Sequence, residues 1–296
     1  MAKVLITGAS GFFGAALLRP AAAAGHQITA VSRTPPQEDV EHIAVDLRDV
    51  AATKLALRDW RWDAVIHLAG TAVKGELTWH ASVDLIDAHV QLLVHLLSAI
   101  PHDWPGRFIH ASGAIVYGTP VAQPVSEEHV RRPLHAYGLA KMLAEDILFG
   151  SSLTDRWLLR TGGLFSESRI SGALFNFARR ALVGEPLVVT TSIPPVPWEL
   201  LHVDDAVDAV LRALAAPSRD PGAINVSYGE PVQIVDIARW FVARASSAST
   251  VELVGDAPPV FQADITKARR LIDWTPVSLT SRLNRYWENM RDGQIR

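Results

Sequence analysis

Residues 4–18 read VLITGASGFFGAALL, and this stretch decides the fold. An apolar run, a turn with three glycines and an alanine- and leucine-rich segment predict a strand, a tight turn and a helix. This order is typical of the opening of a dinucleotide-binding unit, although the spacing is GxxGxxG and not GxGxxG. We expect Gly8 to allow the turn, Gly11 to let backbone N–H groups approach a pyrophosphate, and Gly14 to let the helix pack closely on the strand. A glycine-rich turn without a ligand is the structural alternative.

The composition bounds the class of protein. The chain has 296 residues, of which 49% are hydrophobic, and this is enough for one large α/β domain with a smaller lobe. A net charge of -3 gives no electrostatic reason to expect nucleic acid or a membrane as a partner. The chain contains no cysteine, its start lacks the regions of a signal peptide, and its 11 histidines show no metal-ligand spacing. We therefore expect a cytoplasmic protein without a metal site, and the oligomeric state stays open, with a homodimer as one option.

Strand-like and helix-like segments alternate in the first half of the chain. This alternation predicts a Rossmann-type α/β fold, a doubly wound parallel sheet with ligands at the carboxyl ends of its strands. Prolines and short elements after residue 161 predict a smaller substrate lobe. We expect residues 1–161 to form the dinucleotide-binding domain, residues 199–226 to return to it, and residues 162–198 and 227–296 to form a discontinuous lobe. The expected strands are Val4–Thr7, Gln27–Val31, Glu41–Val45, Ala64–Leu68, Arg107–Ala111, Arg156–Arg160 and Ala223–Val226, and the expected helices are Phe12–Ala24, Val50–Leu57, Trp79–Ile100, Tyr137–Phe149 and Asp204–Ala215.

The ends of the second, third and fourth strands carry candidate cofactor contacts. The second strand ends in Ser32 and Arg33, and a hydroxyl with a guanidinium favours the 2′-phosphate of NADP(H) over the ribose hydroxyl of NAD(H). A solvated surface arginine is the alternative. Asp46 and Leu47 are expected near the adenine, and Asp46 can also cap the following helix. Small residues at 68–70 permit close approach of ribose and nicotinamide.

Tyr137 and Lys141 carry the chemical prediction. Residues four apart share one face of a helix, so the phenol and the ammonium are expected to project together. A nearby cation stabilises a phenolate, and this favours tyrosine as a general acid or base. Ser112 supplies a hydroxyl at the end of a strand, where it could hold a substrate oxygen.

These motifs, taken in order, resemble the extended short-chain dehydrogenase/reductase superfamily, also described as the NAD-dependent epimerase/dehydratase family. The resemblance implies that Tyr137 is the catalytic acid or base, that Lys141 binds the nicotinamide ribose, and that a serine or threonine assists at the carbonyl. The motif at residues 202–205 belongs to the pattern, and a helix start stabilised by acidic residues is its more ordinary role. The resemblance rests on residues 7–14, 67–70, 112–118, 137–141, 159–160, 201–205, 224–226 and 264–269.

The chain departs from that family at several positions. The assisting hydroxyl of relatives aligns with Gly113, one place after Ser112. Ala114-Ile115 replaces the acidic pair of sugar-nucleotide dehydratases, and this disfavours loss of water. Trp198 stands where nucleotide-sugar enzymes often have an arginine for the diphosphate. Asp87 and His89 stand near a common asparagine.

We therefore expect an NADP(H)-dependent oxidoreductase that reduces a ketone or oxidises an alcohol on a small molecule, with a deoxysugar or a nucleotide sugar as the expected class. A nucleotide-sugar epimerase with retained cofactor and a non-catalytic NADP(H)-sensing protein are the alternatives. The expected catalytic residues are Tyr137, Lys141 and Ser112. Substrate contacts are expected from Gly113, Phe165 and Trp198. The expected cofactor contacts are Gly8, Ser10, Gly11, Phe12, Phe13, Gly14, Ser32, Arg33, Asp46, Leu47, Leu68, Ala69, Gly70, Tyr137, Lys141, Gly163 and Leu164.

Overall fold

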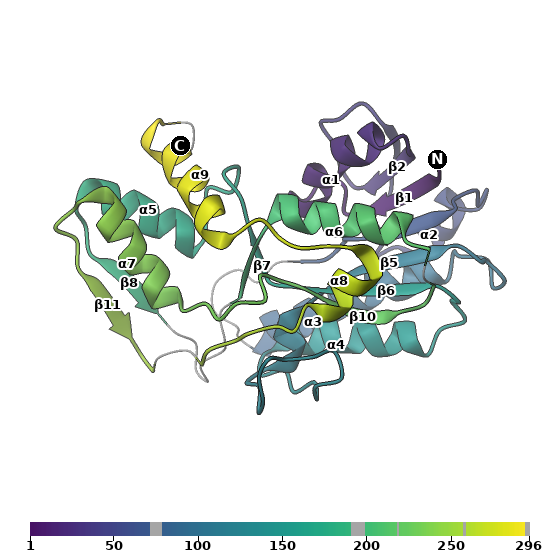
Figure 1. The fold of residues 1–296 in the computed structure, drawn as a ribbon. Coiled ribbons are helices and arrows are strands. Elements are labelled where there is room, and N and C mark those ends of the chain that lie inside the picture. The colour runs from purple at the N-terminus through teal and green to yellow at the C-terminus, as the bar shows by residue number, and fades with distance from the viewer. Residues whose placement is uncertain (72–78, 191–198, 218, 257–258, 294–296) are drawn as a thin grey trace.

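A computed structural model describes residues 1–71, 79–190, 199–217, 219–256 and 259–293. Its main feature is a sheet of seven parallel strands in the order β10-β6-β5-β4-β1-β2-β3 (Figure 1). Chain order reverses between β1 and β4, and a ligand in a sheet of this kind binds at the carboxyl ends on either side of such a reversal. The strands are β1 (Lys3–Thr7), β2 (Gln27–Ser32), β3 (Glu41–Ala44), β4 (Ala64–His67), β5 (Arg107–Gly113), β6 (Arg156–Thr161) and β10 (Gly222–Val226).

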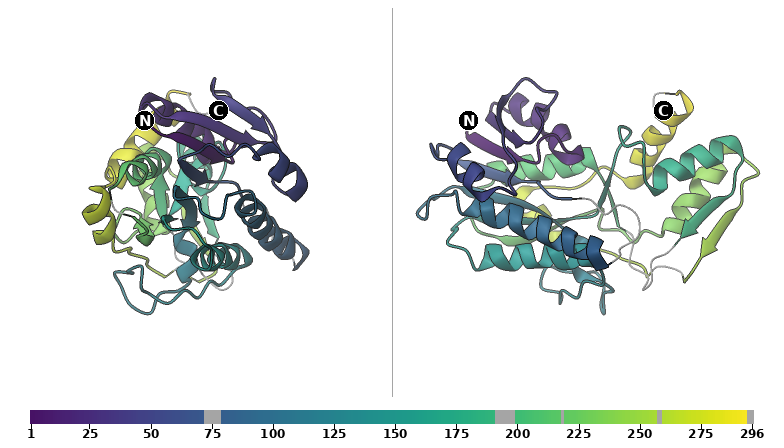
Figure 2. Two further views of the ribbon diagram at one scale, coloured as in Figure 1. Left: turned by 90° about the vertical axis from the view of Figure 1, so that its right-hand side faces the viewer. Right: turned by 180° about the vertical axis from the view of Figure 1, so that it is seen from behind.

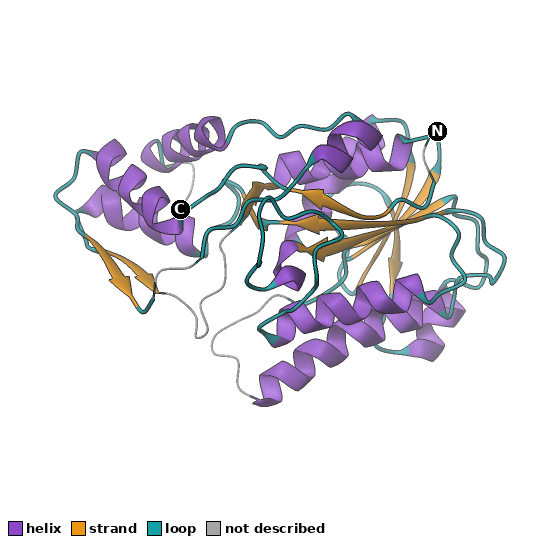
Figure 3. Cartoon of the chain, turned by 60° about the horizontal axis from the view of Figure 1, so that its bottom comes forward, coloured by secondary structure: helices purple, strands orange, loops and turns teal. Residues whose placement is uncertain are grey.

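Two layers of helices cover the sheet, as Figure 3 shows. Side chains alternate between the faces of a strand, so Val4 and Ile6 of β1 join one hydrophobic cluster and Leu5 joins the other. The first cluster contains α1 (Phe12–Ala23) and α6 (Val203–Ala215). The second contains residues of α3 (Trp79–Leu97) and α4 (Ala136–Phe149), beside which lies α2 (Val50–Ala56). The predicted Rossmann-type α/β fold is confirmed.

A smaller lobe stands beside this domain, and Figure 2 shows the division from behind. Its helices pack together, and β8 pairs with β11 in parallel. A separate pair, β7 with β9, follows the main sheet, and a short 3₁₀ helix, η1 (Ala114–Tyr117), follows β5. The elements of the lobe and its neighbours are β7 (Gly163–Phe165), α5 (Ala173–Val183), β8 (Leu187–Thr190), β9 (Leu200–His202), α7 (Ile234–Ala245), β11 (Val251–Val254) and α9 (Leu279–Arg291).

One element differs from the expected division of the chain. Helix α8 (Thr266–Ile272) falls in the range expected for the lobe, but it packs against β10 and α6 of the main domain. Lys267 of this helix donates hydrogen bonds of 2.8 and 2.7 Å to the carbonyl oxygens of Pro221 and Ala223, at the start of β10. The chain therefore returns to the main domain before α9 completes the lobe (Figure 1).

The glycine turn after β1 is packed as tightly as its sequence requires. Gly8 has a φ of +71°, and a Cβ on this residue would lie 2.7 Å from the backbone nitrogen of Ala69. A Cβ on Gly14 would lie 2.3 Å from the carbonyl oxygen of Gly8. Side chains at these positions would push α1 off the sheet.

Among the described residues, no helix has both the length and the apolar composition needed to cross a membrane.

Candidate active site

A cavity of about 820 Å³ lies at the carboxyl ends of the central strands. The start of α1, the segment after β4, the ends of β5 and β6, the first turns of α4 and the segment after β6 contribute to its lining, whereas the predicted contacts Gly8, Ser10, Gly11 and Gly14 do not line it. It therefore brings together residues that are far apart in the sequence. Ten of the predicted site residues line it: Phe12, Phe13, Leu68, Gly70, Ser112, Gly113, Tyr137, Lys141, Gly163 and Leu164.

Tyr137 and Lys141 both face this cavity from α4. Gly138 lies between them in the sequence, and a Cβ there would stand 2.9 Å from the carbonyl oxygen of Ile115, so glycine lets α4 approach η1. Lys141 is buried, its Nζ donates a 2.7 Å hydrogen bond to the carbonyl oxygen of Ala111, and it lies 5.7 Å from the centre of the Tyr137 ring. The helix thus delivers the predicted pair to one wall.

The ionisation of this pair differs from the expectation of a stabilised phenolate. Burial raises the pKa of Tyr137, against a smaller opposing effect of Arg169. Burial also lowers the pKa of Lys141 to about 8, against the opposing charge of Glu145. Loss of water around each group outweighs the nearby charge that favours its ionised form, which is Arg169 for Tyr137 and Glu145 for Lys141. Tyr137 therefore holds its proton at neutral pH, as a proton donor must.

Ser112 is placed differently from its predicted use. Its hydroxyl donates a 2.5 Å hydrogen bond to Oε1 of Glu145, which is buried on α4. Arg160 forms an ion pair of 2.7 Å with the same carboxylate and donates to the hydroxyl of Tyr117, which donates to Asn225. The Ser112 proton is committed to this buried network and is not offered to the cavity. This corrects the expected direction of the hydroxyl. Local sequence could not give that direction, because the hydrogen-bond partners come from distant segments of the chain.

Gly113 leaves space at the position where the family resemblance implies an assisting hydroxyl. Its backbone is extended, with φ -159° and ψ 151°, so any residue can adopt it. A Cβ there would make ordinary contacts, the nearest being 3.6 Å from Ile115 Cγ2 and from the carbonyl oxygen of Thr161. The cavity therefore has room for a side chain at this point.

Three histidines surround the lysine. His89, and not Asp87, lines the cavity, and its ring lies edge-on to the Tyr137 ring at 5.4 Å. Asp87 instead accepts a hydrogen bond from Gln91 on the exposed side of α3. Burial, reinforced by Lys141, lowers the pKa of His67 and of His89 to about 3 and places that of His110 well below its usual value. All three are neutral at neutral pH.

The predicted cofactor contacts at β2 and β3 lie outside the cavity lining. Arg33 is exposed at the end of β2, whereas the Ser32 hydroxyl is buried and donates a 2.7 Å hydrogen bond to the carbonyl oxygen of Thr34. Asp46 forms an ion pair of 2.6 Å with Arg48, which with a smaller contribution of Arg33 lowers the pKa of Asp46 to about 2. Arg33 is therefore free to meet a ligand, while Ser32 is engaged. Roles for Ser10, Leu47 and Ala69 remain predictions.

One predicted substrate contact, Phe165, does not line the cavity. It is buried in the core, with ring contacts to His202 at 5.1 Å and Tyr286 at 6.3 Å. Alternation along β7 explains this, because Leu164 faces the cavity and its neighbour faces away. Trp198 lies outside the described residues.

Sequence reasoning missed Thr161, Arg169 and Glu199, all of which line the cavity. Thr161 ends β6, and Arg169 and Glu199 follow the main strands in loops that only the folded chain brings together. Arg169 donates a 2.7 Å hydrogen bond to the carbonyl oxygen of Leu164 and lies 5.5 Å from the Phe12 ring. An acidic residue before the apolar run Leu200-Leu201 was the one available signal for Glu199.

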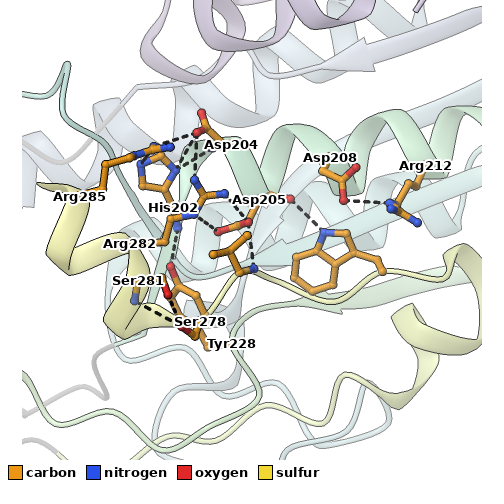
Figure 4. Close-up of polar contacts among 12 residues, drawn as sticks. His202, Asp204, Asp205, Asp208, Arg212, Tyr228, Ser278, Ser281, Arg282 and Arg285 are labelled. Atoms are coloured by element: carbon orange, nitrogen blue, oxygen red, sulfur yellow. Dashed lines mark hydrogen bonds and ion pairs between the residues drawn. The ribbon is translucent and has the colours of Figure 1, made fainter.

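The motif at residues 202–205 has the ordinary structural role (Figure 4). His202 accepts a hydrogen bond from the backbone of Asp204 and so caps α6, whose first turn contains Asp204 and Asp205. Asp205 pairs with Arg282 of α9 at 2.6 Å, and both side chains are buried. The motif thus fastens the C-terminal helix to α6.

In the described part of the chain, no group of three or more histidines and carboxylates could hold a metal ion.

The comparison with known proteins agrees with this geometry. The profile of the NAD dependent epimerase/dehydratase family matches residues 4–227. UDP-arabinose 4-epimerase 1 of Arabidopsis thaliana is 27% identical over an alignment of 319 residues. This alignment covers 92% of this chain and 75% of that protein. The dTDP-4-dehydro-6-deoxy-D-allose reductase of Streptomyces bikiniensis is 25% identical over 313 residues, which cover 95% and 93%.

Solved structures share the fold at lower sequence identity. A UDP-glucose 4-epimerase from Thermotoga maritima, determined with UDP-glucose, has a TM-score of 0.81 and 21% identity, with 99% of each chain covered. A UDP-glucuronic acid 4-epimerase from Bacillus cereus, in complex with UDP-glucuronic acid and NAD, has a TM-score of 0.81 and 22% identity, with 98% of this chain and 99% of that chain covered. On the family match and the shared fold, this chain belongs to the NAD-dependent epimerase/dehydratase family of the extended short-chain dehydrogenase/reductase enzymes.

Proposed function

We propose that this protein reduces a ketone on a small, oxygen-rich molecule of the sugar or nucleotide-sugar class, with a pyridine dinucleotide as hydride donor. The observation that carries the proposal is the protonated Tyr137 beside Lys141 in one cavity with Phe12 and Phe13, which follow Gly11 at the start of α1. A sensing protein would need the dinucleotide site but not a buried acid with a lysine next to it, so we place sensing behind catalysis.

The residues around the glycine turn fit a dinucleotide. Gly11 stands at the N-cap of α1 in an extended conformation. Because glycine has no side chain, the N-cap residue does not cap the first N–H groups of the helix. The first N–H groups of a helix have no acceptor within it, so those of α1 suit a pyrophosphate. Phe12, Leu68 and Gly70 then border the place where the reacting ring would lie. When bound, the dinucleotide supplies the hydride.

The protein side of the reaction is a proton transfer. Tyr137 donates its proton to the carbonyl oxygen as that oxygen gains negative charge, so that one hydride and one proton convert the ketone to an alcohol. Lys141, tied to the end of β5 through Ala111, stabilises the phenolate that remains. Ser112, whose proton is donated to Glu145, takes no part in this proton transfer.

We further propose a preference for NADP(H) over NAD(H). The exposed guanidinium of Arg33 at the end of β2 supports this, because it can bind a phosphate in a bidentate manner. Cells keep NADPH mostly reduced, which favours the direction of ketone reduction.

Epimerisation with retained cofactor is the second candidate. The Arabidopsis relative is named a UDP-arabinose 4-epimerase, and its match covers 92% of this chain. An epimerase oxidises and then reduces one carbon, so it uses the same proton carrier in both directions.

Isotope transfer separates these functions. A panel of UDP- and dTDP-sugars and their 4-keto derivatives is incubated with the protein in two series. One series contains NADPH deuterated at C4 of the nicotinamide, and the other contains NADP⁺ or NAD⁺, because an epimerase needs an oxidised cofactor for its first step. A reductase places deuterium in the product and consumes NADPH, whereas an epimerase interconverts two sugars without net consumption. Absence of turnover across the panel, together with NADPH-dependent association with another protein, would establish sensing in place of catalysis.

A further inference from the structure

Glu199 lies at one wall of the cavity in a position that the proposed chemistry does not use. It directly precedes β9, and its carbonyl oxygen accepts a 2.7 Å hydrogen bond from the backbone nitrogen of Gly163. Its side chain runs past Gly162, where a Cβ would lie 3.1 Å from Glu199 Cγ. The two glycines after β6 therefore leave the carboxyl group a path to the cavity, which it lines.

The hydrogen bonding of this carboxyl group is incomplete. The hydroxyl of Ser227, just after β10, donates to Oε1 of Glu199. The other oxygen, Oε2, is buried and has no hydrogen-bond partner in the described part of the chain. A buried polar atom without a partner costs free energy, and such atoms in a cavity indicate a group that a ligand completes.

The protonation state decides what kind of partner Oε2 needs. Burial raises the pKa of Glu199 well above its usual value, and no nearby charge contributes to this shift. Because Oε1 accepts the Ser227 proton, the carboxyl proton belongs on Oε2. The open position is therefore a hydrogen-bond donor that lacks an acceptor.

The sheet order tells which ligand reaches this donor. The glycine turn follows β1, whereas Gly162 follows β6 and Ser227 follows β10, which lie on the far side of β4 and β5. A dinucleotide held at the glycine turn extends toward Tyr137 near β5. We therefore assign the oxygen that meets Glu199 to the substrate. Because the expected cofactor contacts Gly163 and Leu164 lie beside Glu199, a loss of dinucleotide affinity in Glu199→Ala with unchanged sugar affinity would overturn this assignment.

We propose that Glu199 recognises the substrate by donating a hydrogen bond from Oε2 to an uncharged hydroxyl or carbonyl oxygen of a sugar-like molecule. This inference rests on the proposed function, since it deepens the choice of substrate at the same cavity. Lys141 and Arg169, the cations that line the cavity, are better suited than Glu199 to binding an anionic group of the substrate. Glu199 therefore binds the uncharged, oxygen-rich part of the substrate.

A pH dependence follows with a definite sign. The neutral carboxyl group donates and the ionised one cannot, so substrate affinity is retained below the raised pKa of Glu199 and lost as the pH rises through it. Ser227 contacts the group from the β10 side, Gly162 and Thr161 border it from β6, and the charged groups of the same cavity are Lys141 and Arg169. Loss of the Lys141 proton near pH 8 would affect all variants alike.

The test compares Glu199→Gln, Glu199→Ala and a matched control, Glu127→Gln. Glutamine keeps an N–H donor beside a carbonyl and does not titrate. Glu127 is also half-buried with a pKa raised by burial, but it accepts a 2.8 Å hydrogen bond from the Asn225 backbone and does not line the cavity. Each protein is saturated with whichever of NAD⁺ and NADP⁺ it binds more tightly. Affinity for UDP-glucose and dTDP-glucose is then measured by calorimetry from about pH 6 to about pH 9.

We expect Glu199→Ala to weaken binding of a nucleotide sugar by about 3- to 10-fold, the range of one uncharged hydrogen bond. Glu199→Gln should bind the sugars nearly as well as the native protein at low pH. At high pH it should not show the loss of sugar affinity that ionisation of Glu199 causes in the native protein, whereas Glu127→Gln should still show that loss. If Glu199→Ala does not fold, the pH profile of Glu199→Gln decides alone.

Native affinity in Glu199→Ala, or an unchanged high-pH decline in Glu199→Gln, would overturn the inference. If those results accompany normal turnover of the sugars, the proposed function stands and the role of Glu199 falls. If the dinucleotide-loaded native protein binds neither sugar, both fall together.

Discussion

Ser112 donates a 2.5 Å hydrogen bond to Glu145, and this contact directs the serine hydroxyl away from the reaction and into the network of Arg160. We expect Ser112→Ala to lower the free energy of unfolding by about 1–3 kcal/mol, because Glu145 stays buried with one donor fewer. Its effect on kcat should be small beside that of Tyr137→Phe. Urea unfolding and steady-state kinetics on the same preparation measure both. A loss of kcat as large as that of Tyr137→Phe, without a loss of stability, would return Ser112 to the catalytic group.

Gly113→Ser should supply a hydroxyl where the cavity has space for one. The extended backbone accepts a side chain, and the nearest atoms lie at 3.6 Å from the added Cβ. A new hydrogen bond to the carbonyl oxygen is expected to raise kcat by about 2- to 10-fold. Gly113→Ala is the matched control, since it adds the Cβ without the hydroxyl. Equal kcat for the two variants would show that no substrate oxygen lies near this position.

Arg33→Ala should weaken NADPH binding by about 1–3 kcal/mol and leave NADH binding nearly unchanged, because only the 2′-phosphate needs the guanidinium. Arg58→Ala is the control, since Arg58 is also exposed and pairs only weakly with Asp59 at 3.5 Å. Fluorescence titration with NADPH and with NADH gives two dissociation constants for each protein. Equal affinity of the native protein for NADPH and NADH would refute the NADP(H) preference.

Asp205→Ala should strongly destabilise the chain, because it removes the buried partner of the Arg282 guanidinium and leaves only the exposed carboxylate of Asp204 at 3.1 Å. Breaking a buried pair in this way typically costs about 3–5 kcal/mol. On the same helix, Asp208 pairs with Arg212 in an exposed contact, and Asp208→Ala should cost less than about 1 kcal/mol. Urea unfolding of both variants measures the difference. Similar midpoints would mean that the contact of α9 with α6 contributes little to stability.

Local pattern was sufficient for most of the fold. The run at residues 4–18 predicted β1 and α1 nearly to the residue, and the spacing of Tyr137 and Lys141 placed both on one helix. Long-range contacts decided what the pattern could not. The direction of Ser112 depends on Glu145 and Arg160, and the exposure of Glu199 to the cavity depends on Gly162. None of these partners is near in the sequence, so no periodicity could reveal them.

Tyr137 carries the proton in the proposed ketone reduction, and a single-turnover measurement on Tyr137→Phe shows directly whether it does. The change removes one oxygen from a residue that lines the cavity and leaves the ring that contacts His89. Tyr286→Phe serves as the control, since Tyr286 is buried and does not line the cavity. With NADPH and the sugar that the isotope panel identifies, we expect Tyr137→Phe to slow hydride transfer by about 10²- to 10⁴-fold with nearly native NADPH affinity. Hydride transfer at the native rate in Tyr137→Phe would contradict the account.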